Sequence, residues 1–302
     1  MTAAGNPGSD ARSGAPAWEF AATGTRWRLY HSGNAEQSVA VALADAIELD
    51  EARWSRFRQD SELTRLNRAA GTWQTVSEET FALLAACEKW RRHTGGVFQP
   101  LVGRALEAWG YEASISVRAP FAPSSPSGMQ VGQSVRLDET RTRVLIPSGT
   151  SIDVGGIGKG WIAARAAGVI THLCDDPALL LDAGGDVVSV TGEHLVAVEG
   201  PDELWIRLRA GQAVATSGHG RRRWVNGDGQ AAHHLIDPAT GAPGPRTQAT
   251  VIAEDPVAAD VMAKVLALRP ELVGATPYPA LVRTPDGTTA SDTWPDAVSS
   301  SN

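Results

Sequence analysis

The segment Ser151–Trp161, with the sequence S-I-D-V-G-G-I-G-K-G-W, constrains this chain more than any other. An aspartate in a short apolar run is followed by glycines and a lysine, which lead into the alanine-rich helical pattern of Ile162–Ile170. Glycines at the entrance to a helix leave backbone N–H groups uncovered, so an anionic group can approach them closely. Because Lys159 adds a positive charge to the same turn, the segment predicts a phosphate site. The alternative is a glycine-rich turn that simply joins a strand to a helix.

Two familiar glycine signatures do not fit this segment. A Walker A loop needs Ser or Thr after its lysine to hold magnesium, whereas Gly160 follows Lys159. The dinucleotide-binding fingerprint reads G-x-G-x-x-G, whereas Gly156, Gly158 and Gly160 give G-x-G-x-G. The sequence therefore supports neither a P-loop nucleotidase nor a Rossmann dehydrogenase.

Composition and charge narrow the class of protein. The chain has 302 residues, of which 42% are hydrophobic and 20% charged, enough for a substantial core. Its formal net charge of −7 gives no support to binding of nucleic acid or of an anionic membrane. The 2 cysteines, Cys87 and Cys174, both fall in expected helices, so neither a disulfide framework nor a zinc site is expected. Residues 1–17 do not read as a signal peptide, and no run is apolar enough to span a membrane. We therefore expect a cytoplasmic protein without membrane insertion.

Helical and strand patterns come in mixed order, without regular alternation of strand and helix. This order predicts an α+β fold, with one domain over residues 18–295 and disordered tails at 1–17 and 296–302. The expected helices cover 34–57 (capped by Asn34), 77–94 (capped by Ser77), 162–170 and 256–267, with a turn or short helix at 61–67. The expected strands cover 26–31, 178–182, 187–190, 195–198, 205–208 and 250–252.

Further short motifs carry residues suited to chemistry. They are Gly24-Thr25, S-E-L-T-R-L-N at 61–67, G-V-F-Q-P at 96–100, W-G-Y at 109–111, G-G-D at 184–186, A-T-S-G at 215–218, H-H-L-I-D-P-A-T-G at 233–241 and Ala259-Asp260. Together with D-V-G-G-I-G-K-G-W at 153–161, this ordered set closely resembles the FAD:protein FMN transferase (ApbE) family over roughly residues 20–285. Each motif alone is weak, and their common order makes the resemblance specific.

The resemblance implies a single ApbE-like domain of mixed, largely antiparallel sheets with packed helices. It also implies an enzyme that binds FAD and transfers the FMN half to a Ser or Thr hydroxyl of an acceptor flavoprotein with a flavinylation motif, releasing AMP. Such a transfer needs positioning, charge neutralisation and a proton acceptor.

The resemblance also assigns roles to particular residues. It makes His234 and Asp260 catalytic candidates, and Lys264 is added to them because it lies one helical turn from Asp260. Mg²⁺ would be held by Gly156, Asp260 and Ala263. The residues expected to contact the flavin nucleotide are Thr23, Phe57, Phe98, Gln99, Pro100, Asp153, Lys159, Leu235 and Ile236.

Plainer interpretations stay open for several of these residues. Asp153 could only cap the glycine-rich turn, and Asp237 could be ordinary turn chemistry. Phe57 and Phe98 are as compatible with the core as with flavin contact.

The two neighbouring histidines cannot both point the same way from a strand. We expect His234 to face the site and His233 to face solvent. His234 is a candidate base because neutral imidazole is poised near pH 7.

Where the chain departs from the family pattern, it loses acidic groups and gains cations. Lys264 stands where the family usually has Thr, Ser or Ala, and one helical turn places it beside Asp260. A lysine ammonium there would compete with Mg²⁺ or replace its charge. Gln99 stands for the usual Asp of F-D-P, Thr23 for the usual Met before Gly-Thr, and a basic run at 221–223 follows A-T-S-G. We expect FAD binding to be retained, with Lys264 taking over part of the role of Mg²⁺.

Two other functions stay open at this point. One is a protein that binds FAD without transferring any part of it. The other is a hydrolase that cleaves FAD to FMN and AMP, with water in place of the acceptor hydroxyl.

Overall fold

The computed structural model describes residues 18–33, 35–111, 133–201, 204–220 and 222–296. The expected tails at 1–17 and 296–302 lie outside these residues, apart from Asp296, and so does Asn34, the expected helix cap. Within the described ranges, no helix is both long enough and apolar enough to cross a membrane.

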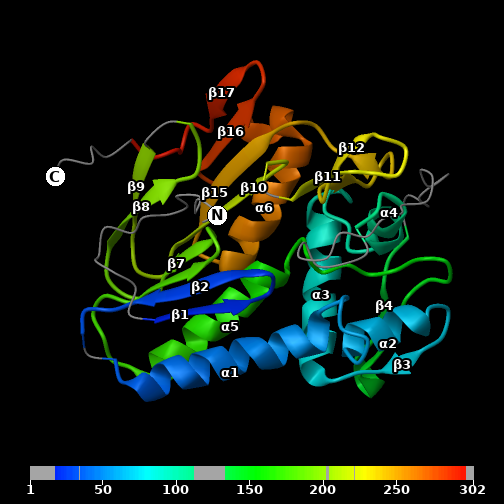
Figure 1. The fold of residues 1–302 in the computed structure, drawn as a ribbon, viewed down its shortest axis with the longest axis horizontal. Coiled ribbons are helices and arrows are strands. Elements are labelled where there is room, and N and C mark those ends of the chain that lie inside the picture. The colour runs from blue at the N-terminus through cyan, green and yellow to red at the C-terminus, as the bar shows by residue number, and fades with distance from the viewer. Residues whose placement is uncertain (1–17, 34, 112–132, 202–203, 221, 297–302) are drawn as a thin grey trace, which may run out of the picture.

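One antiparallel sheet forms the centre of the fold (Figure 1). Its strands follow the order β1-β2-β6-β7-β10-β15-β16-β17, and every neighbouring pair is antiparallel. In chain order these strands span Trp18–Ala22, Thr25–Tyr30, Leu180–Ala183, Val187–Ser189, Ala213–Gly218, Gln248–Ala253, Ala280–Thr284 and Gly287–Ala290. The predicted α+β class with largely antiparallel sheets is confirmed.

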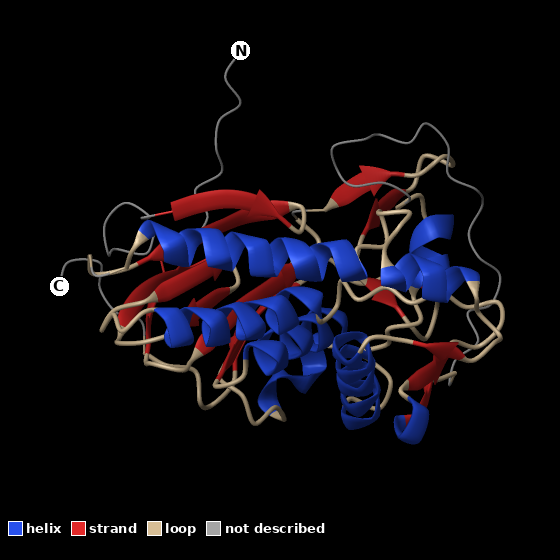
Figure 2. Ribbon diagram, turned by 90° about the horizontal axis from the view of Figure 1, so that it is seen from below, coloured by secondary structure: helices blue, strands red, loops and turns tan. Residues whose placement is uncertain are grey.

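Helices cover one face of this sheet (Figure 2). They are α1 (Gln37–Trp54), α5 (Gly158–Leu173) and α6 (Pro256–Leu268). α6 packs against β10, β15 and α5, and α5 in turn packs against α1. Every residue of α6 from Val257 to Leu268 is buried, as expected for a helix that is apolar nearly all round. The main hydrophobic core lies between this helical layer and the sheet.

The opposite face of the sheet is covered by a hairpin of β8 (His194–Val198) and β9 (Leu204–Leu208). Val196 and Ile206 of the hairpin pack in one cluster with Leu180 of the sheet. Because both faces are covered, β6 and β7 are buried along their whole length, whereas β8 alternates between buried and partly exposed residues.

A second group of elements lies beside the sheet, to the right in Figure 1. It comprises α2 (Glu62–Arg68), α3 (Glu78–His93), α4 (Gly103–Ala108), β3 (Gln74–Thr75), β4 (Arg136–Asp138), β5 (Arg143–Leu145), β11 (Arg223–Val225), β12 (Ala231–His233), β13 (Ile236–Asp237) and β14 (Ala242–Pro243). Short 3₁₀ turns occupy Glu139–Arg141 and Pro270–Gly274. The C-terminal end of α1 reaches this group, so the chain that follows α1 enters the junction between the two parts.

Helix ends decide which residues reach that junction. α1 ends at Trp54, so the expected continuation of the helix to Phe57 is wrong, and Arg56 and Phe57 lie in a turn. Cys174 lies just beyond the end of α5 and not inside a helix as expected. The expected cap of α3 is confirmed, because Ser77 Oγ accepts a hydrogen bond from the N–H of Thr80 at 3.2 Å.

Candidate functional site

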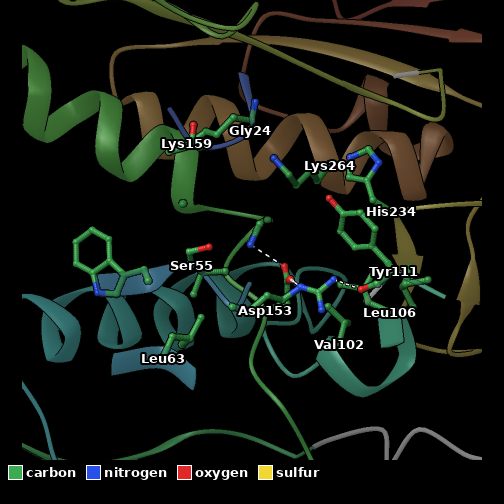
Figure 3. Close-up of a pocket in the computed structure, with 18 of the residues that line it drawn as sticks. Gly24, Ser55, Leu63, Val102, Leu106, Tyr111, Asp153, Lys159, His234 and Lys264 are labelled. Carbon is green, nitrogen blue, oxygen red and sulfur yellow. Dashed lines mark hydrogen bonds and ion pairs between the residues drawn. The ribbon is translucent and has the colours of Figure 1, made fainter. Parts of the chain in front are cut away.

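A pocket of about 340 Å³ lies at the junction between the sheet and the smaller group of elements (Figure 3). It is walled by the tip of the β1–β2 hairpin, the loop after α1, the segment before α4, the glycine-rich turn before α5, the chain around β13, and α6. Most residues singled out from the sequence line it. They are Thr23, Phe57, Phe98, Gln99, Asp153, Gly156, Lys159, His234, Leu235, Ile236 and Lys264.

The β1–β2 hairpin places Thr23 in the pocket wall. Thr23 and Gly24 have φ angles of 51° and 68°, the left-handed conformation of a two-residue hairpin turn. A threonine is strained in this conformation, and two hydrogen bonds hold it there. Its N–H donates to Glu51 Oε2 at 2.6 Å, and its Oγ1 accepts from Trp27 Nε1 at 3.0 Å. The first bond fastens the hairpin tip to the end of α1.

Asp153 is held by more than its own turn. Its Oδ1 accepts from the N–H of Gly155 at 2.7 Å, as a capping residue would, and its Oδ2 pairs with Arg56 Nε at 2.7 Å. The guanidinium of Arg56 lies over the rings of Phe57 and Tyr111, 4.4 and 4.8 Å from their centroids. It also donates to the backbone carbonyl of Tyr111. Arg56 therefore joins the carboxylate to an aromatic wall.

The glycine-rich turn does not offer the row of free N–H groups that the sequence suggested. The N–H groups of Ile157 and Gly158 donate to the carbonyl of Val154 at 3.0 and 2.7 Å. The N–H of Gly160 donates to Asp260 Oδ2 at 2.9 Å. Because these amides are used inside the protein, the expectation that they bind a phosphate is wrong for them. Positive charge at this wall comes from side chains.

Gly160 is required by the close approach of α5 to α6. A Cβ atom there would lie 2.5 Å from the carbonyl oxygen of Pro256 and 2.8 Å from Asp260 Cβ. Gly160→Ala is expected to lower the free energy of unfolding by about 1–3 kcal/mol, because overpacking forces the two helices apart. Urea denaturation measures the change. Gly168→Ala, in the same helix with open space around it, is the control and should stabilise by up to about 1 kcal/mol. Equal effects of the two substitutions would contradict this explanation.

Lys159 pairs with a carboxylate from another element. Its ammonium forms an ion pair with Asp186 Oδ2, and Asp186 Oδ1 accepts from the N–H of Thr216 at 3.2 Å. Asp186 belongs to the turn between β6 and β7, so the pair ties the first turn of α5 to the sheet. The G-G-D motif thus supplies the counter-charge for the lysine of the glycine-rich turn.

α6 carries Asp260 and Lys264 one helical turn apart. The ammonium of Lys264 pairs with Asp260 Oδ1 and donates to the backbone oxygen of Asp260 at 3.3 Å, so the predicted pairing is confirmed. Asp260 is 1% exposed and Lys264 is 7% exposed. Burial raises the pKa of the Asp260 carboxyl, but the charges of Lys264 and Lys159 and the N–H of Gly160 outweigh burial and hold it below its usual value. Lys264 and His234 share one side of the pocket in Figure 3.

These residues fit a fixed ammonium better than Mg²⁺. Both oxygens of Asp260 are engaged, Oδ1 by Lys264 and Oδ2 by the N–H of Gly160. Lys264 also packs against Gly156, with its Cδ 3.7 Å from where a Cβ of that glycine would be. Ala263 is fully buried and has no side-chain ligand to offer. Among the described residues, no cluster of three or more His, Cys, Asp and Glu side chains could hold a metal ion.

The consecutive histidines have different surroundings. His233 is buried, with Nε2 3.0 Å from the carbonyl of Gly244, so the expectation that it faces solvent is wrong. His234 lines the pocket as expected, and its Nδ1 is enclosed without a hydrogen-bond partner in the described part of the chain. Burial lowers the pKa of His234 well below its usual value, and the charges of Arg222 and Lys264 lower it further. The imidazole is therefore neutral at neutral pH.

Asp237 holds the turn that follows the histidines. Its carboxylate accepts two bonds from the guanidinium of Arg269, at 2.8 and 3.1 Å, and one from the N–H of Ala239 at 3.0 Å. Pro238, and not Asp237, lines the pocket. The turn interpretation of Asp237 therefore accounts for this residue.

Some expected site residues lie behind the pocket wall. They are Pro100, Asp260 and Ala263. The carbonyl of Pro100 accepts from the N–H of Asp153 at 2.8 Å, so Pro100 supports the aspartate from behind. Asp260 does not line the pocket, but Lys264, which pairs with it, does.

Other pocket residues were not among the expected site residues, although Arg222 belongs to the basic run at 221–223. Glu51, Arg56 and Arg222 all line the pocket. None belongs to a glycine or histidine motif, and nothing in their spacing predicts their partners. Both phenylalanines left open between core and pocket line the pocket, where Phe98 is 6% exposed and Phe57 is 36% exposed.

Comparison with known proteins matches most of the chain. The profile of the ApbE family matches residues 23–276. An FAD:protein FMN transferase of Klebsiella pneumoniae (strain 342) is 29% identical over 228 residues, which is 69% of this chain and 68% of the relative. An FAD:protein FMN transferase of Treponema pallidum (strain Nichols) is 28% identical over 248 residues, 72% of this chain and 67% of the relative. The crystal structure of the ApbE protein from Thermotoga maritima superposes with a TM-score of 0.80 at 27% identity, covering 92% of this chain and 97% of that one.

Proposed function

This chain belongs to the ApbE family, and we propose on that basis that it binds FAD and transfers the FMN moiety to a protein. The acceptor is a Ser or Thr hydroxyl, and AMP is released. The names of the relatives support this activity. The observation that carries the proposal for the site is that a neutral His234, whose Nδ1 has no hydrogen-bond partner among the described residues, meets Lys264 and Asp153 in one pocket.

His234 is the proton acceptor in this proposal. The acceptor hydroxyl gives its proton to the neutral imidazole, and its oxygen forms a bond to the phosphorus on the flavin side of the pyrophosphate. The bond from that phosphorus to the bridging oxygen breaks, and AMP leaves with the electron pair. Phosphoryl transfer of this kind is promoted by positioning and by hydrogen-bond donors next to the oxygens of the reacting phosphates. The ammonium groups of Lys264 and Lys159 supply such donors locally, although each is paired with an aspartate.

The flavin-binding set remains a prediction, and the place of its members in the pocket supports it for all of them except Pro100. Phe57, Phe98 and Tyr111 line the pocket with aromatic carbon, and Leu235 and Ile236 provide apolar surface on the wall contributed by β13 and the segment before it. A flat ring system is bound well by such surfaces. Asp153, fixed by Arg56, offers a carboxylate oxygen at a defined position.

Lys264 takes the place of Mg²⁺ in this proposal. Its ammonium already neutralises Asp260 within the pocket wall, so the positive charge that a metal would bring is built into α6. No step of the transfer is assigned to a metal ion.

The test of the proposal is incubation of the full chain with FAD and a peptide that carries a Ser or Thr flavinylation motif. A fluorescent flavin bound covalently to the peptide, with one AMP released per label, is the expected result. AMP and free FMN without labelled peptide would instead establish the hydrolase. Unchanged, bound FAD would establish a binding protein.

The same assay tests whether transfer depends on the Lys264 ammonium or on Mg²⁺. Labelling by the unaltered protein should be insensitive to EDTA, whereas Lys264→Thr, which vacates the space beside Asp260, should need added Mg²⁺. Loss of labelling by the unaltered protein in EDTA would refute the assignment to Lys264.

A further inference from the structure

The cations that line the pocket differ in whether a carboxylate neutralises them. All except Arg222 have an acidic partner among the described residues. The pairs are Arg56–Asp153, Arg58–Glu48, Lys159–Asp186 and Lys264–Asp260. In the part of the chain that the structure describes, no hydrogen bond or ion pair engages the guanidinium of Arg222.

Arg222 lies between the hairpin tip and the proposed base. A guanidinium nitrogen lies 3.9 Å from where a Cβ of Gly24 would be, so the side chain reaches the turn that also carries Thr23. Its backbone oxygen accepts from the N–H of His234 at 3.3 Å. Arg222 is partly buried in the pocket wall, whereas Arg223, the next residue, is exposed.

Charge balance indicates what this arginine binds. Lys159 and Lys264 are each offset by an aspartate, so they add little net positive charge to the pocket. A dinucleotide brings a negative charge on each of its phosphates, and burial of such charges without a counter-charge is costly. The guanidinium of Arg222, which pairs with no carboxylate among the described residues, supplies that charge and can donate two parallel hydrogen bonds to phosphate oxygens.

We propose that Arg222 binds the pyrophosphate of the flavin dinucleotide at the hairpin-tip end of the pocket. In this position it makes the site select phosphorylated flavins over riboflavin. The inference rests on the proposed function for the identity of the ligand, but it concerns binding alone.

The test compares Arg222→Gln with Arg222→Lys by titration of flavin fluorescence, without an acceptor peptide. Arg222→Gln should weaken FAD binding about 10- to 100-fold, because a charge-assisted contact is lost, and leave riboflavin binding unchanged. Arg222→Lys should recover part of the affinity for FAD, since it restores the charge but not the paired donors. Arg223→Gln is the matched control and should bind both flavins as the unaltered protein does.

The outcomes separate this inference from the transferase proposal. Equal weakening of FAD and riboflavin by Arg222→Gln, or unchanged FAD binding, would overturn the role of Arg222. Thermal unfolding of each variant shows whether a loss of affinity reflects a loss of fold. If the unaltered protein selects FAD through Arg222 but labels no peptide, the transferase proposal fails and the binding role stands.

Discussion

Replacement of His234 by glutamine should lower the rate of flavin transfer about 10²- to 10⁴-fold and leave FAD affinity nearly unchanged. Glutamine keeps a polar side chain of similar reach but cannot take up a proton at neutral pH. Single-turnover labelling of the acceptor peptide measures the rate, and flavin fluorescence measures the affinity. His233→Gln is the comparison, because His233 lies against Gly244 in the turn and not in the pocket. A fall in affinity as large as the fall in rate would indicate a binding role instead.

The fall of the flavin-transfer rate at acidic pH reports on the protonation of His234. The pKa of His234 is lowered by burial and by Arg222 and Lys264, so the base is neutral throughout the neutral range. The rate should therefore fall only when the pH drops below the usual histidine value of about 6.5, and no inflection should occur at that value. An inflection near the usual value would show that His234 is not the group that accepts the proton.

The free energy of unfolding should also depend on pH, in the direction set by the lowered pKa of His234. A histidine whose pKa is depressed by folding binds its proton more weakly in the folded state than in the unfolded state. Its contribution is fully present above the unfolded-state pKa and is lost as the pH falls below it. The unaltered protein should lose more unfolding free energy between pH 7 and pH 5 than His234→Gln does.

Lys264→Met should destabilise the fold by about 3–5 kcal/mol, because it leaves the Asp260 carboxylate buried without its cation. Guanidinium denaturation of the full chain measures the loss. The double variant Asp260→Asn with Lys264→Met should recover most of the stability, since asparagine can still accept the Gly160 N–H and carries no charge. Failure of the double variant to recover would place the cost in packing of the lysine chain and not in the unpaired charge.

An exposed ion pair provides the contrast for that measurement. Arg207 pairs with Glu193 on the β8–β9 hairpin, and the two side chains are 51% and 48% exposed. Arg207→Met should cost little, because exposed pairs are screened by water. A cost comparable to that of Lys264→Met would show that burial is not what makes the α6 pair important.

Local sequence patterns predicted the elements and one side-chain pair of the site. The spacing of Asp260 and Lys264 places them one turn apart on any helix, so their contact needed no knowledge of the rest of the fold. The apolar run of α6 and its aspartate-proline start predicted the helix to within one residue of its end. The ordered motifs likewise identified most of the residues that line the pocket, and their resemblance to a family supplied the expected activity.

Other features of the site depend on partners that are distant in the chain. Arg56 is fixed by Asp153, Lys159 by Asp186, and Thr23 by Glu51, and no periodicity relates the members of these pairs. The prediction that was most clearly wrong concerned the glycine-rich turn. The N–H of Gly160, which we expected to bind a phosphate, donates to Asp260 Oδ2 instead.

The segment from Asp153 to Gly160 shows what the sequence determines and what the tertiary structure determines. Its sequence alone determined that a tight turn enters a helix beside a lysine, because glycine, helix periodicity and charge act over a few neighbouring residues. The tertiary structure decided which of its donors and charges remain for a ligand, because α6 and the β6–β7 turn bring up the carboxylates that use them. It also left Arg222, from the chain just before β11, as the cation in the pocket that pairs with no carboxylate among the described residues.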